Sequence, residues 1–532
     1  MTAAPTQAPP ADVAAPDPAF VADTLAGAAD TRTSSASVDA ALFTGGTYVA
    51  QGVQFVAGLV QKSILGPVGS GTWALMQSFW TFMTITSLGA QPGATRQVPM
   101  LRGRGDYRAA QVTANTSATF SISMIAIAGV VLAIVALAFG SGWDEQVRWG
   151  VLLLGVTAPL RLFTDTHEVL IQCVKRFDIA SSTVVLKALL TLVFQTLAVL
   201  AFGVYGMFLG VVIVEALGVV YWMRIGIISF QRPAFRPQIS WLRLKELISF
   251  GAPILVYAQV WLLFQAADSL IVAGALSLRQ LGYYALAGSV TQYLLYLPRS
   301  IGGAVFPRMA ETWGRTGRLE DIHHYATEVQ RLLAYVMVPL AVGAAFFAFP
   351  VLIRHLLPAF DPAVDVVQIM VAASFFMALM NMPIKVLMTA GYRWSLTAIA
   401  FVCLLLNIGI NVLMVVVLDL GLEGAATATA ISYLVTFVLT TGYSLSRVIP
   451  PREVVVHLGE IVLVFVYLYG ALRGIEGLFG SAEGSLIADT ALAALKFAIL
   501  VVVMLPWLWL AERRVQGISR LRTLALKAVL RG

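Results

Sequence analysis

The sequence is poor in charge and almost lacks cysteine. Of its 532 residues only 12% are charged, and two are cysteines. Soluble globular domains are about 25% charged on average, so the shortage of charge excludes an ordinary soluble domain. Cys173 and Cys403 lie in separate apolar segments without the spacing of a metal site. We interpret them as ordinary buried thiols and predict no metal site.

The beginning of the sequence also lacks the pattern of a secretory leader. The first forty residues are rich in Ala, Pro, Thr and Asp, and Arg32 is their only basic residue. They contain no apolar run of the kind that a signal peptide needs. We expect residues 1–38 to form a disordered cytoplasmic tail.

Apolar residues are what the sequence has in abundance. They make up 59% of the chain and give it a mean hydropathy of +0.83. A helix needs about 20 mostly apolar residues to cross a bilayer, and runs of that length recur along the whole chain. The sequence therefore predicts an all-α integral membrane protein with about 14 transmembrane helices, at 40–61, 71–91, 114–139, 149–174, 179–202, 206–229, 247–275, 282–306, 331–356, 364–390, 395–418, 423–446, 455–474 and 487–511.

Basic residues are concentrated in every second loop. These loops carry most of the Arg and Lys outside the spans, namely Arg96, Arg102, Arg104, Arg108, Lys175, Arg176, Arg232, Arg236, Arg243, Lys245, Arg308, Arg315, Arg318, Arg393, Arg447 and Arg452. The loops between them hold mostly one basic residue each. The positive-inside rule then places both termini in the cytoplasm of a bacterial inner membrane. We interpret the net charge of +7 as a topology signal and expect no nucleic-acid partner.

The chain also contains an internal repeat. The stretch "GTWALMQS" from Gly71 resembles "GYYALAGS" from Gly282, and "GR" at Gly103 matches "GR" at Gly314. Both matches are 211 residues apart, and a constant spacing is expected of duplicated units. Each unit would hold six spans, an even number, so the two copies would run parallel through the membrane. In transporters with parallel repeats, substrate binds at the interface between the halves.

These observations divide the chain into parts. We expect two parallel six-helix lobes around a central cavity, followed by two further helices. A basic amphipathic tail at the C-terminus would lie on anionic lipid. The predicted parts are the tail 1–38, an N-lobe 39–230, a cytoplasmic linker 231–246, a C-lobe 247–447, the final helix pair 448–511 and the tail 512–532.

The sequence shows none of the common motifs of catalytic residues. We find no paired acids, no HExxH and no P-loop, and the "THEV" around His167 lacks a second histidine at the required spacing. The loops expected on the outer side are short, whereas an enzyme acting on exported sugars would need a larger domain there. The sequence therefore predicts a transporter without catalytic residues, cofactor or metal.

Three stretches resemble a known family. They are "AADSLIVAGALSLRQLGYYALAGSV", "PRSIGGAVFPRM" and "LLLNIGINVLMVVVLDLGLEGAATATAISY". Together they are similar to the polysaccharide-transporter branch (Wzx-like oligosaccharide flippases) of the multidrug/oligosaccharidyl-lipid/polysaccharide flippase superfamily, over about residues 40–450. The resemblance implies a flippase that moves undecaprenyl-diphosphate-linked oligosaccharide from the inner to the outer leaflet for O-antigen, capsule or exopolysaccharide assembly. The implied partners are this lipid-linked glycan, membrane lipid, and a polysaccharide polymerase with its export machinery.

Other functions compatible with the sequence remain open. Within the superfamily, the cargo could be lipid II or a drug exchanged for a cation. Drug antiporters of this kind use an acid in the first span, where this chain has only Asp39 at the edge. A major-facilitator carrier would also have two six-helix repeats, but "MLRGRGDYRAA" does not fit its loop motif. A non-transporting scaffold or a polymerase is disfavoured by the intramembrane charges and by the short outer loops, respectively.

Ionisable residues inside the predicted spans are the candidate site residues, because charge is expensive in a bilayer and marks function there. We predict that cations and aromatic rings bind the diphosphate and the sugars, namely Arg299, Lys187, Arg161, Lys385, Tyr293 and Tyr296. Asp268 and Glu215 are candidates for coupling or for ion pairs, and an Arg299–Asp268 pair would be the structural alternative. Arg161 has Asp165 one turn further on, which favours local pairing. Lys496 lies in the final helix pair and could reach the surface by extending its side chain.

Overall fold

The computed structural model describes residues 36–173, 176–225, 237–480 and 484–514. These residues are almost entirely helical, which confirms the predicted all-α class. Short π-helical segments, Thr191–Gln195, Leu333–Met337 and Val412–Val417, continue or join longer helices. The α-helices are α2 (Ala36–Met83), α3 (Ala90–Gly103), α4 (Tyr107–Phe139), α5 (Glu145–Cys173), α6 (Phe177–Leu190), α7 (Thr196–Ile225), α8 (Trp241–Ala275), α9 (Leu278–Leu294), α10 (Tyr296–Thr316), α11 (His323–Leu332), α12 (Val338–Leu356), α13 (Val364–Leu379), α14 (Asn381–Thr389), α15 (Arg393–Asn411), α16 (Gly421–Leu445), α17 (Pro451–Phe479), α18 (Leu486–Val503) and α19 (Leu505–Arg514).

Ten helical segments among the described residues are long and apolar enough to cross a membrane, so the chain is a multi-pass membrane protein. One of them, Ile179–Arg224, contains two of the predicted spans. Its helix breaks at Gly203, and α2 breaks at Gly66. Both glycines have a positive φ, which residues with a Cβ adopt only with strain. Each break lies between two predicted spans; the total of fourteen remains a prediction.

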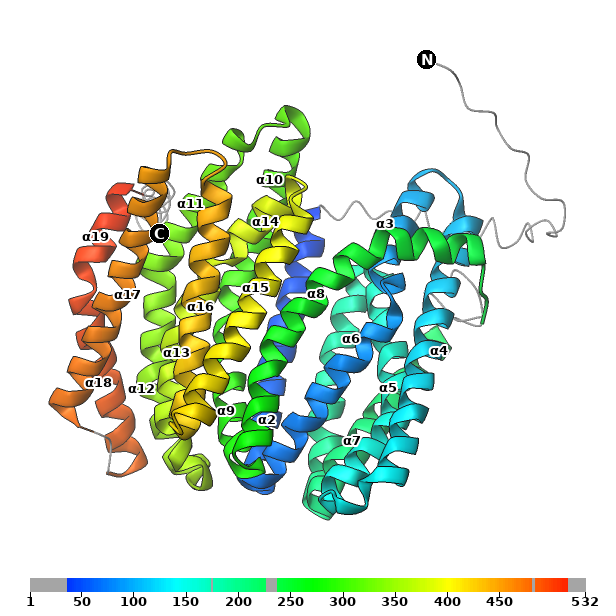
Figure 1. Ribbon diagram of the computed structural model, residues 1–532, viewed down its shortest axis with the longest axis horizontal. Coiled ribbons are helices and arrows are strands. Elements are labelled where there is room, and N and C mark those ends of the chain that lie inside the picture. Colours follow the sequence, from blue (N-terminus) through cyan, green and yellow to red (C-terminus); the bar gives the residue numbers. More distant parts are fainter. Residues whose placement is uncertain (1–35, 174–175, 226–236, 481–483, 515–532) are drawn as a thin grey trace, which may run out of the picture.

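The helices form two bundles that lie side by side (Figure 1). One contains α4–α7, and the other contains α9–α18. Two long helices connect them: α2 packs against α6 and α7 of the first bundle and α9 of the second, while α8 packs against α3, α4 and α15. We call the first bundle the N-lobe and the second the C-lobe; this C-lobe includes α17 and α18, which the prediction from the sequence sets apart as a final helix pair.

The two lobes meet where the sequence repeat predicts equivalent residues. A Cβ on Gly71 of α2 would collide with the backbone of Leu278, and a Cβ on Gly282 of α9 would collide with the backbone of Pro67. Pro67 and Leu278 are 211 residues apart, as are Gly71 and Gly282. The two contacts are therefore equivalent under the repeat, which supports a pseudo-twofold relation between the lobes.

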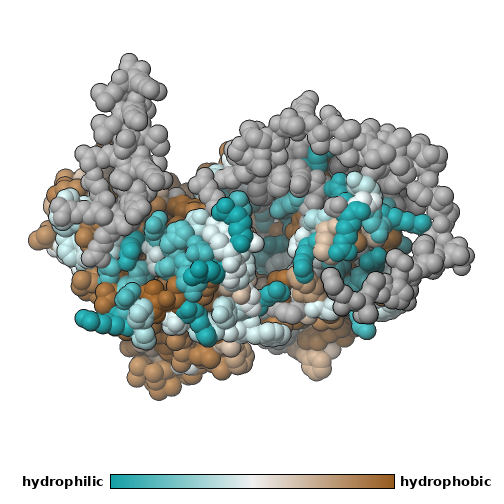
Figure 2. Space-filling view, turned by 90° about the horizontal axis from the view of Figure 1, so that it is seen from above, coloured by the Kyte–Doolittle hydropathy of each residue, from teal (hydrophilic) through white to brown (hydrophobic). Residues whose placement is uncertain are grey.

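The two ends of the molecule differ in charge. The connections that carry most of the basic residues lie at the upper end in Figure 1, namely α3 and the α10–α11, α14–α15 and α16–α17 connections. We therefore call it the basic end. Figure 2 views this end and shows hydrophilic residues over both lobes and apolar residues along the flanks. The opposite end, with the α12–α13 and α17–α18 connections, we call the far end. Apolar side chains exposed on the outer helices, such as Leu137, Leu200 and Leu463, form the surface that faces lipid.

Several predicted boundaries are wrong. The span 282–306 is two helices, because α9 ends at Leu294 and α10 begins at Tyr296. Residues 241–246 belong to α8, so only part of 231–246 can be a linker, and residues 226–236 lie outside the described residues. The helix α2 begins at Ala36 and thus includes the end of the predicted tail 1–38. Most of that tail and residues 515–532 of the C-terminal tail also lie outside the described residues.

Candidate substrate-binding site

Arg299 lies just after the break between α9 and α10. Pro298 has no amide hydrogen to donate one turn back along the helix, which accounts for the interruption there. Pro298 is buried, whereas the Arg299 side chain is exposed. The proline therefore packs in the interior, and the guanidinium of the next residue stays accessible.

The guanidinium of Arg299 borders a pocket of about 190 Å³ in the C-lobe. Tyr257 and Trp261 of α8 and Asn381 of α14 line the same pocket. Arg299 donates a hydrogen bond from Nη2 to Oε1 of Gln292 over 3.1 Å. Among the described residues no carboxylate pairs with Arg299. The pocket therefore combines an accessible cation with aromatic and amide groups, the chemistry that phosphate and sugar hydroxyls require.

Two predicted aromatic site residues, Tyr296 and Tyr293, lie near this pocket. The Arg299 guanidinium is 6.0 Å from the ring centre of Tyr296, whose ring lies 6.3 Å from that of Tyr293. Tyr293 packs edge-on against Phe55 of α2, with 4.9 Å between ring centres. The structure thus brings Arg299, Tyr296 and Tyr293 together, although Tyr293 is partly engaged in packing.

Lys385 of α14 approaches the same region from the basic end. Its Nζ lies 5.6 Å from the ring centre of Phe306 on α10 and close to Gly302. The side-chain oxygen of Asn381, one turn earlier, is buried and has no hydrogen-bond partner within the described part of the chain. Lys385 and Asn381 therefore present donor and acceptor groups beside Arg299 that the protein itself leaves largely unused.

Asp268 is not paired with Arg299; neutral groups hold it instead. Its Oδ2 accepts hydrogen bonds from the hydroxyls of Thr429 (2.8 Å) and Tyr284 (2.9 Å), and its Oδ1 accepts one from Nδ2 of Asn411 (2.8 Å). Asp268 is only 3% exposed. The possible ion pair with Arg299 is therefore wrong, and Tyr284 is buried against this carboxylate.

The surroundings of Asp268 contain further polar atoms without partners. Asn407 lies beside the carboxylate, and among the described residues its amide oxygen accepts no hydrogen bond, like the amide oxygen of Asn411. Both residues are fully buried. Unsatisfied buried polar groups are rare in native proteins and point to an absent water or ion. A carboxylate, two amide oxygens and the hydroxyl of Thr429 are oxygen ligands suited to a hard cation.

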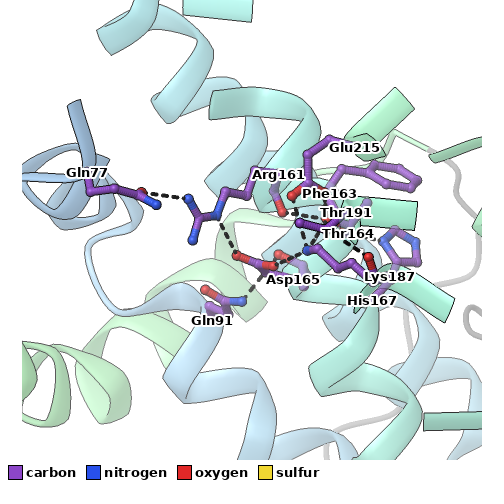
Figure 3. A network of polar contacts seen from close by, with 11 residues as sticks. Gln77, Gln91, Arg161, Phe163, Thr164, Asp165, His167, Lys187, Thr191 and Glu215 are labelled. Carbon is purple, nitrogen blue, oxygen red and sulfur yellow. Dashed lines mark hydrogen bonds and ion pairs between the residues drawn. The ribbon is translucent and has the colours of Figure 1, made fainter. Parts of the chain in front are cut away.

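The N-lobe holds a second, different cluster of charge (Figure 3). Lys187 of α6 is bound by two carboxylates, Asp165 of α5 at 3.2 Å and Glu215 of α7 at 3.1 Å. Thr164 donates a further hydrogen bond to Glu215 over 2.6 Å. Glu215 is therefore an ion-pair residue. Lys187 holds α5, α6 and α7 together, so the predicted substrate contact of this lysine has no support in the geometry.

Arg161 is also engaged within the N-lobe. Its Nη1 donates to Oε1 of Gln77 over 3.0 Å (Figure 3). Its guanidinium also lies 4.6 Å from the ring centre of Trp80. The predicted local pair with Asp165 is present as a longer contact of 3.9 Å. Arg161 thus connects α5 to α2, and only a small pocket of about 20 Å³ adjoins it. These contacts favour a structural role.

Sequence reasoning missed several members of the C-lobe site. Asn407, Asn411 and Thr429 lie in one of the stretches that resemble the family, which assigns them no role. No sequence motif singles out Gln292 or Asn381. Their signal was present, because each is a polar residue inside an apolar span. The helical spacing of Asn407 and Asn411, one turn apart, places both on one face. That this face meets Asp268 depends on the packing of α15 against α8.

The family follows from comparison with known sequences. A family described as polysaccharide biosynthesis protein matches residues 64–365, which is more than half of the chain. The chain belongs to this family. None of the curated proteins matches the sequence.

Solved structures show which fold the family member adopts. An inward-facing multidrug resistance MATE transporter of the MOP superfamily matches with a TM-score of 0.62 and 17% identity, over 75% of this chain and 94% of that one. The lipid II flippase MurJ, in an inward closed conformation, matches with a TM-score of 0.63 and 12% identity, over 87% and 98%. An outward-facing MATE transporter gives 0.57 at 16% identity, over 77% and 95%. The chain therefore shares the fold of these transporters, two of which belong to the MOP superfamily.

Proposed function

We propose that this family member is a flippase that moves an undecaprenyl-diphosphate-linked oligosaccharide from the inner to the outer leaflet of a bacterial inner membrane. In this proposal the basic end faces the cytoplasm, as the positive-inside rule favours. The lobes alternate between openings to the two sides, and the glycan then enters O-antigen, capsule or exopolysaccharide assembly. The other partners would be the polysaccharide polymerase and its export machinery.

The single observation that carries this proposal is the accessible Arg299 in the C-lobe pocket. A diphosphate is anionic and costly to bring into a membrane, so its carrier needs a cation whose charge is not already neutralised. Arg299 meets this requirement, because its hydrogen-bond acceptor is the neutral Gln292. The planar guanidinium offers two parallel donors to phosphate oxygens. Tyr296 and Trp261 add ring faces that suit sugars.

Asp268 supplies a site for a coupling ion in the same lobe. We propose that a proton or a sodium ion binds its carboxylate, with the side-chain oxygens of Asn407, Asn411 and Thr429 as the further ligands for sodium. These residues come from α8, α15 and α16. An ion bound here would therefore change how tightly these three helices pack, which is a means of biasing the two states of a transporter.

Two other cargoes are compatible with the same fold. Lipid II has the same lipid diphosphate, so Arg299 would serve it equally well, and the family assignment to polysaccharide biosynthesis favours the other glycans. A drug antiporter would not require an unpaired cation at Arg299. A major-facilitator carrier is disfavoured by the match to the MATE and MurJ folds.

Deletion of the gene tests the cargo. We expect a lipid-linked oligosaccharide to accumulate on the cytoplasmic side of the membrane, and wild-type protein to reverse this. Arg299→Gln at equal protein level should fail to reverse it. Arg315→Gln is the matched control, because Arg315 lies on the same helix α10 and is exposed, with no ion pair or side-chain hydrogen bond among the described residues. Accumulation of lipid II alone would instead identify a peptidoglycan-precursor flippase, and unchanged lipid pools would contradict the proposal.

A melting experiment tests the coupling ion. Purified protein is heated in sodium chloride and in potassium chloride of equal ionic strength, at two pH values. If sodium binds at Asp268, the Tm rises with sodium, and Asp268→Asn abolishes the rise. If a proton binds instead, sodium has no effect and the pH dependence of Tm is lost in Asp268→Asn. An Asp268→Asn protein with unchanged responses to both ions would refute the site.

A further inference from the structure

A second polar pocket lies at the far end of the C-lobe, away from Arg299. It has a volume of about 350 Å³ and is enclosed by α12, α13, α17 and α18. Three cations and four acids line it: Arg354, Arg473, Lys496, Asp361, Asp365, Glu476 and Asp489. So many charges beside lipid-facing helices need a reason, because each is costly there.

The charges form a built site rather than a scatter of exposed side chains. Lys496 is 4% exposed and donates to Glu476 over 2.9 Å, which corrects the expectation that it extends to the surface. Asp489 is 3% exposed and contacts His355 over 2.8 Å. The pocket walls are therefore held in place by the Lys496–Glu476 ion pair and by the Asp489–His355 contact, which connect α12, α17 and α18.

Two of the lining charges lack an oppositely charged partner among the described residues. Arg473 donates only to neutral groups, to the hydroxyl of Tyr469 over 3.2 Å and weakly to Oε1 of Gln368 over 3.4 Å. Asp365 is exposed and has no ion pair among the described residues. The pocket thus offers one cation and one anion to a ligand.

An apolar groove of about 410 Å³ continues from this pocket along the lipid-facing side. It runs between α12 and α18, and Val351 and Ala493 line both the groove and the pocket. On α12 the groove extends from Ala344 to Leu356. That is roughly 18 Å of helix at about 1.5 Å per residue. One leaflet of a bilayer core is about 15 Å thick, so the groove matches the length of lipid chains in a single leaflet.

We propose that this pocket and groove bind a phospholipid with a zwitterionic headgroup that carries an amine and a phosphate. The phosphate would lie against Arg473, the amine against Asp365, and one acyl chain in the groove. At ordinary charges the lining holds three cations and four anions, so it would repel a diphosphate but accept a headgroup without net charge. The lipid would attach the helix pair α17–α18 to α12 and α13 within the C-lobe.

This site is distinct from the proposed cargo site. The pocket at Arg299 is formed by α8, α10, α13 and α14 toward the basic end, and it shares no lining residue with the far-end pocket. Lipid binding here does not depend on the identity of the cargo. Only its placement in the outer leaflet depends on the orientation proposed above.

Native mass spectrometry of the purified protein tests the proposal directly. Phosphatidylethanolamine, phosphatidylglycerol and undecaprenyl diphosphate are added in turn, the first two with identical acyl chains. We expect phosphatidylethanolamine to bind most tightly and its affinity to fall roughly tenfold or more in Arg473→Gln, the loss expected for one charge-assisted hydrogen bond. Undecaprenyl diphosphate is expected to bind at Arg299, so its binding should be unchanged in Arg473→Gln. Equal or tighter binding of phosphatidylglycerol, or an Arg473→Gln protein that loses undecaprenyl diphosphate and keeps phosphatidylethanolamine, would overturn the assignment.

A pair of tryptophan variants separates lipid binding from folding. Ala348→Trp fills the groove from an exposed position on α12, whereas Ala498→Trp adds the same ring at an exposed position of α18 outside the groove. Ala348→Trp should lose the bound phosphatidylethanolamine and Ala498→Trp should keep it. If Arg473→Gln does not fold, this pair decides the question. Retention of the lipid in a folded Ala348→Trp protein would refute the site.

Discussion

At the scale of single residues, the surroundings of the intramembrane cations separate their roles. Lys187 lies within 3.2 Å of two carboxylates, whereas Arg299 contacts a neutral amide and an aromatic ring. The sequence alone gives the two residues the same appearance, a lone cation in an apolar span. Their difference follows from the acids that neighbouring helices bring to Lys187 and do not bring to Arg299.

The first prediction concerns Arg299 and Asp268. Because the two side chains have no shared partner, Asp268→Asn should not rescue Arg299→Gln, and glycan export should stay absent in the double variant. Arg299→Lys should retain part of the export, since it keeps the charge but loses the second parallel donor. Export is measured as surface polysaccharide at matched protein levels. Recovery of export in the double variant would show that Arg299 serves only to neutralise Asp268.

The second prediction concerns Lys187 and the stability of the N-lobe. Lys187→Gln leaves the buried Glu215 without its cation, so the free energy of unfolding should fall by about 3 kcal/mol. Lys187→Met combined with Glu215→Leu removes both charges and should restore most of the Tm. The measurement is thermal unfolding in detergent. A Lys187→Gln protein that melts like wild type but loses export would instead support substrate contact at Lys187.

At the scale of helices, glycines determine how closely the lobes meet. The helices α2 and α9 touch backbone to backbone at Gly71 and Gly282, where no Cβ fits. The breaks at Gly66 and Gly203 let one helix turn back into the next span. A sequence pattern of repeated glycines could locate these positions, but it could not show that the two repeats face each other there.

The third prediction tests this contact. Gly282→Ala inserts a methyl group against the backbone of Pro67 and should destabilise the protein by about 1–3 kcal/mol or weaken transport, because the lobes must separate slightly. Gly288→Ala is the matched control on the same helix, where nothing lies within 4 Å of the added atom. Equal Tm and equal export for the two variants would contradict a tight contact between the lobes.

At the scale of the whole molecule, the two ends differ in the residues they expose. Trp394 lies at the basic end beside Arg393 and is 66% exposed. Ile487 lies at the far end, at the start of α18, and is 83% exposed. Both residues lie in the first turn of their helices, next to a connection between helices, so a cysteine there should be reached by a reagent in the water on its own side of the membrane.

The fourth prediction uses these two positions to test the orientation. In a protein whose native cysteines are replaced, a membrane-impermeant maleimide added to intact cells should label Ile487→Cys but not Trp394→Cys. Both should be labelled once the membrane is opened, which controls for accessibility. Labelling of Trp394→Cys alone in intact cells would reverse the orientation and with it the proposed direction of transport.

Composition and the spacing of apolar runs were sufficient to predict the all-α membrane class. Matched segments indicated the internal repeat, and the flippase superfamily was only implied by the resemblance of three stretches to a known family. These features depend on local sequence, because a bilayer requires about 20 apolar residues for each helix wherever the helix lies in the bundle. The same local information identified Arg299, Asp268 and Lys187 as exceptional residues. It could not assign them partners, since each partner belongs to a helix distant in the chain.

Tertiary structure decided what those residues do. The packing of α8 with α15 brings Asn411 to Asp268, and the packing of α5, α6 and α7 surrounds Lys187 with acids. The far-end pocket forms where α17 and α18 meet α12 and α13. Arg473 and Lys496 line this pocket, which their positions in the sequence do not indicate. Local sequence shows which charged residues lie inside membrane-spanning helices. The contacts between helices determine which of them remain available to a ligand.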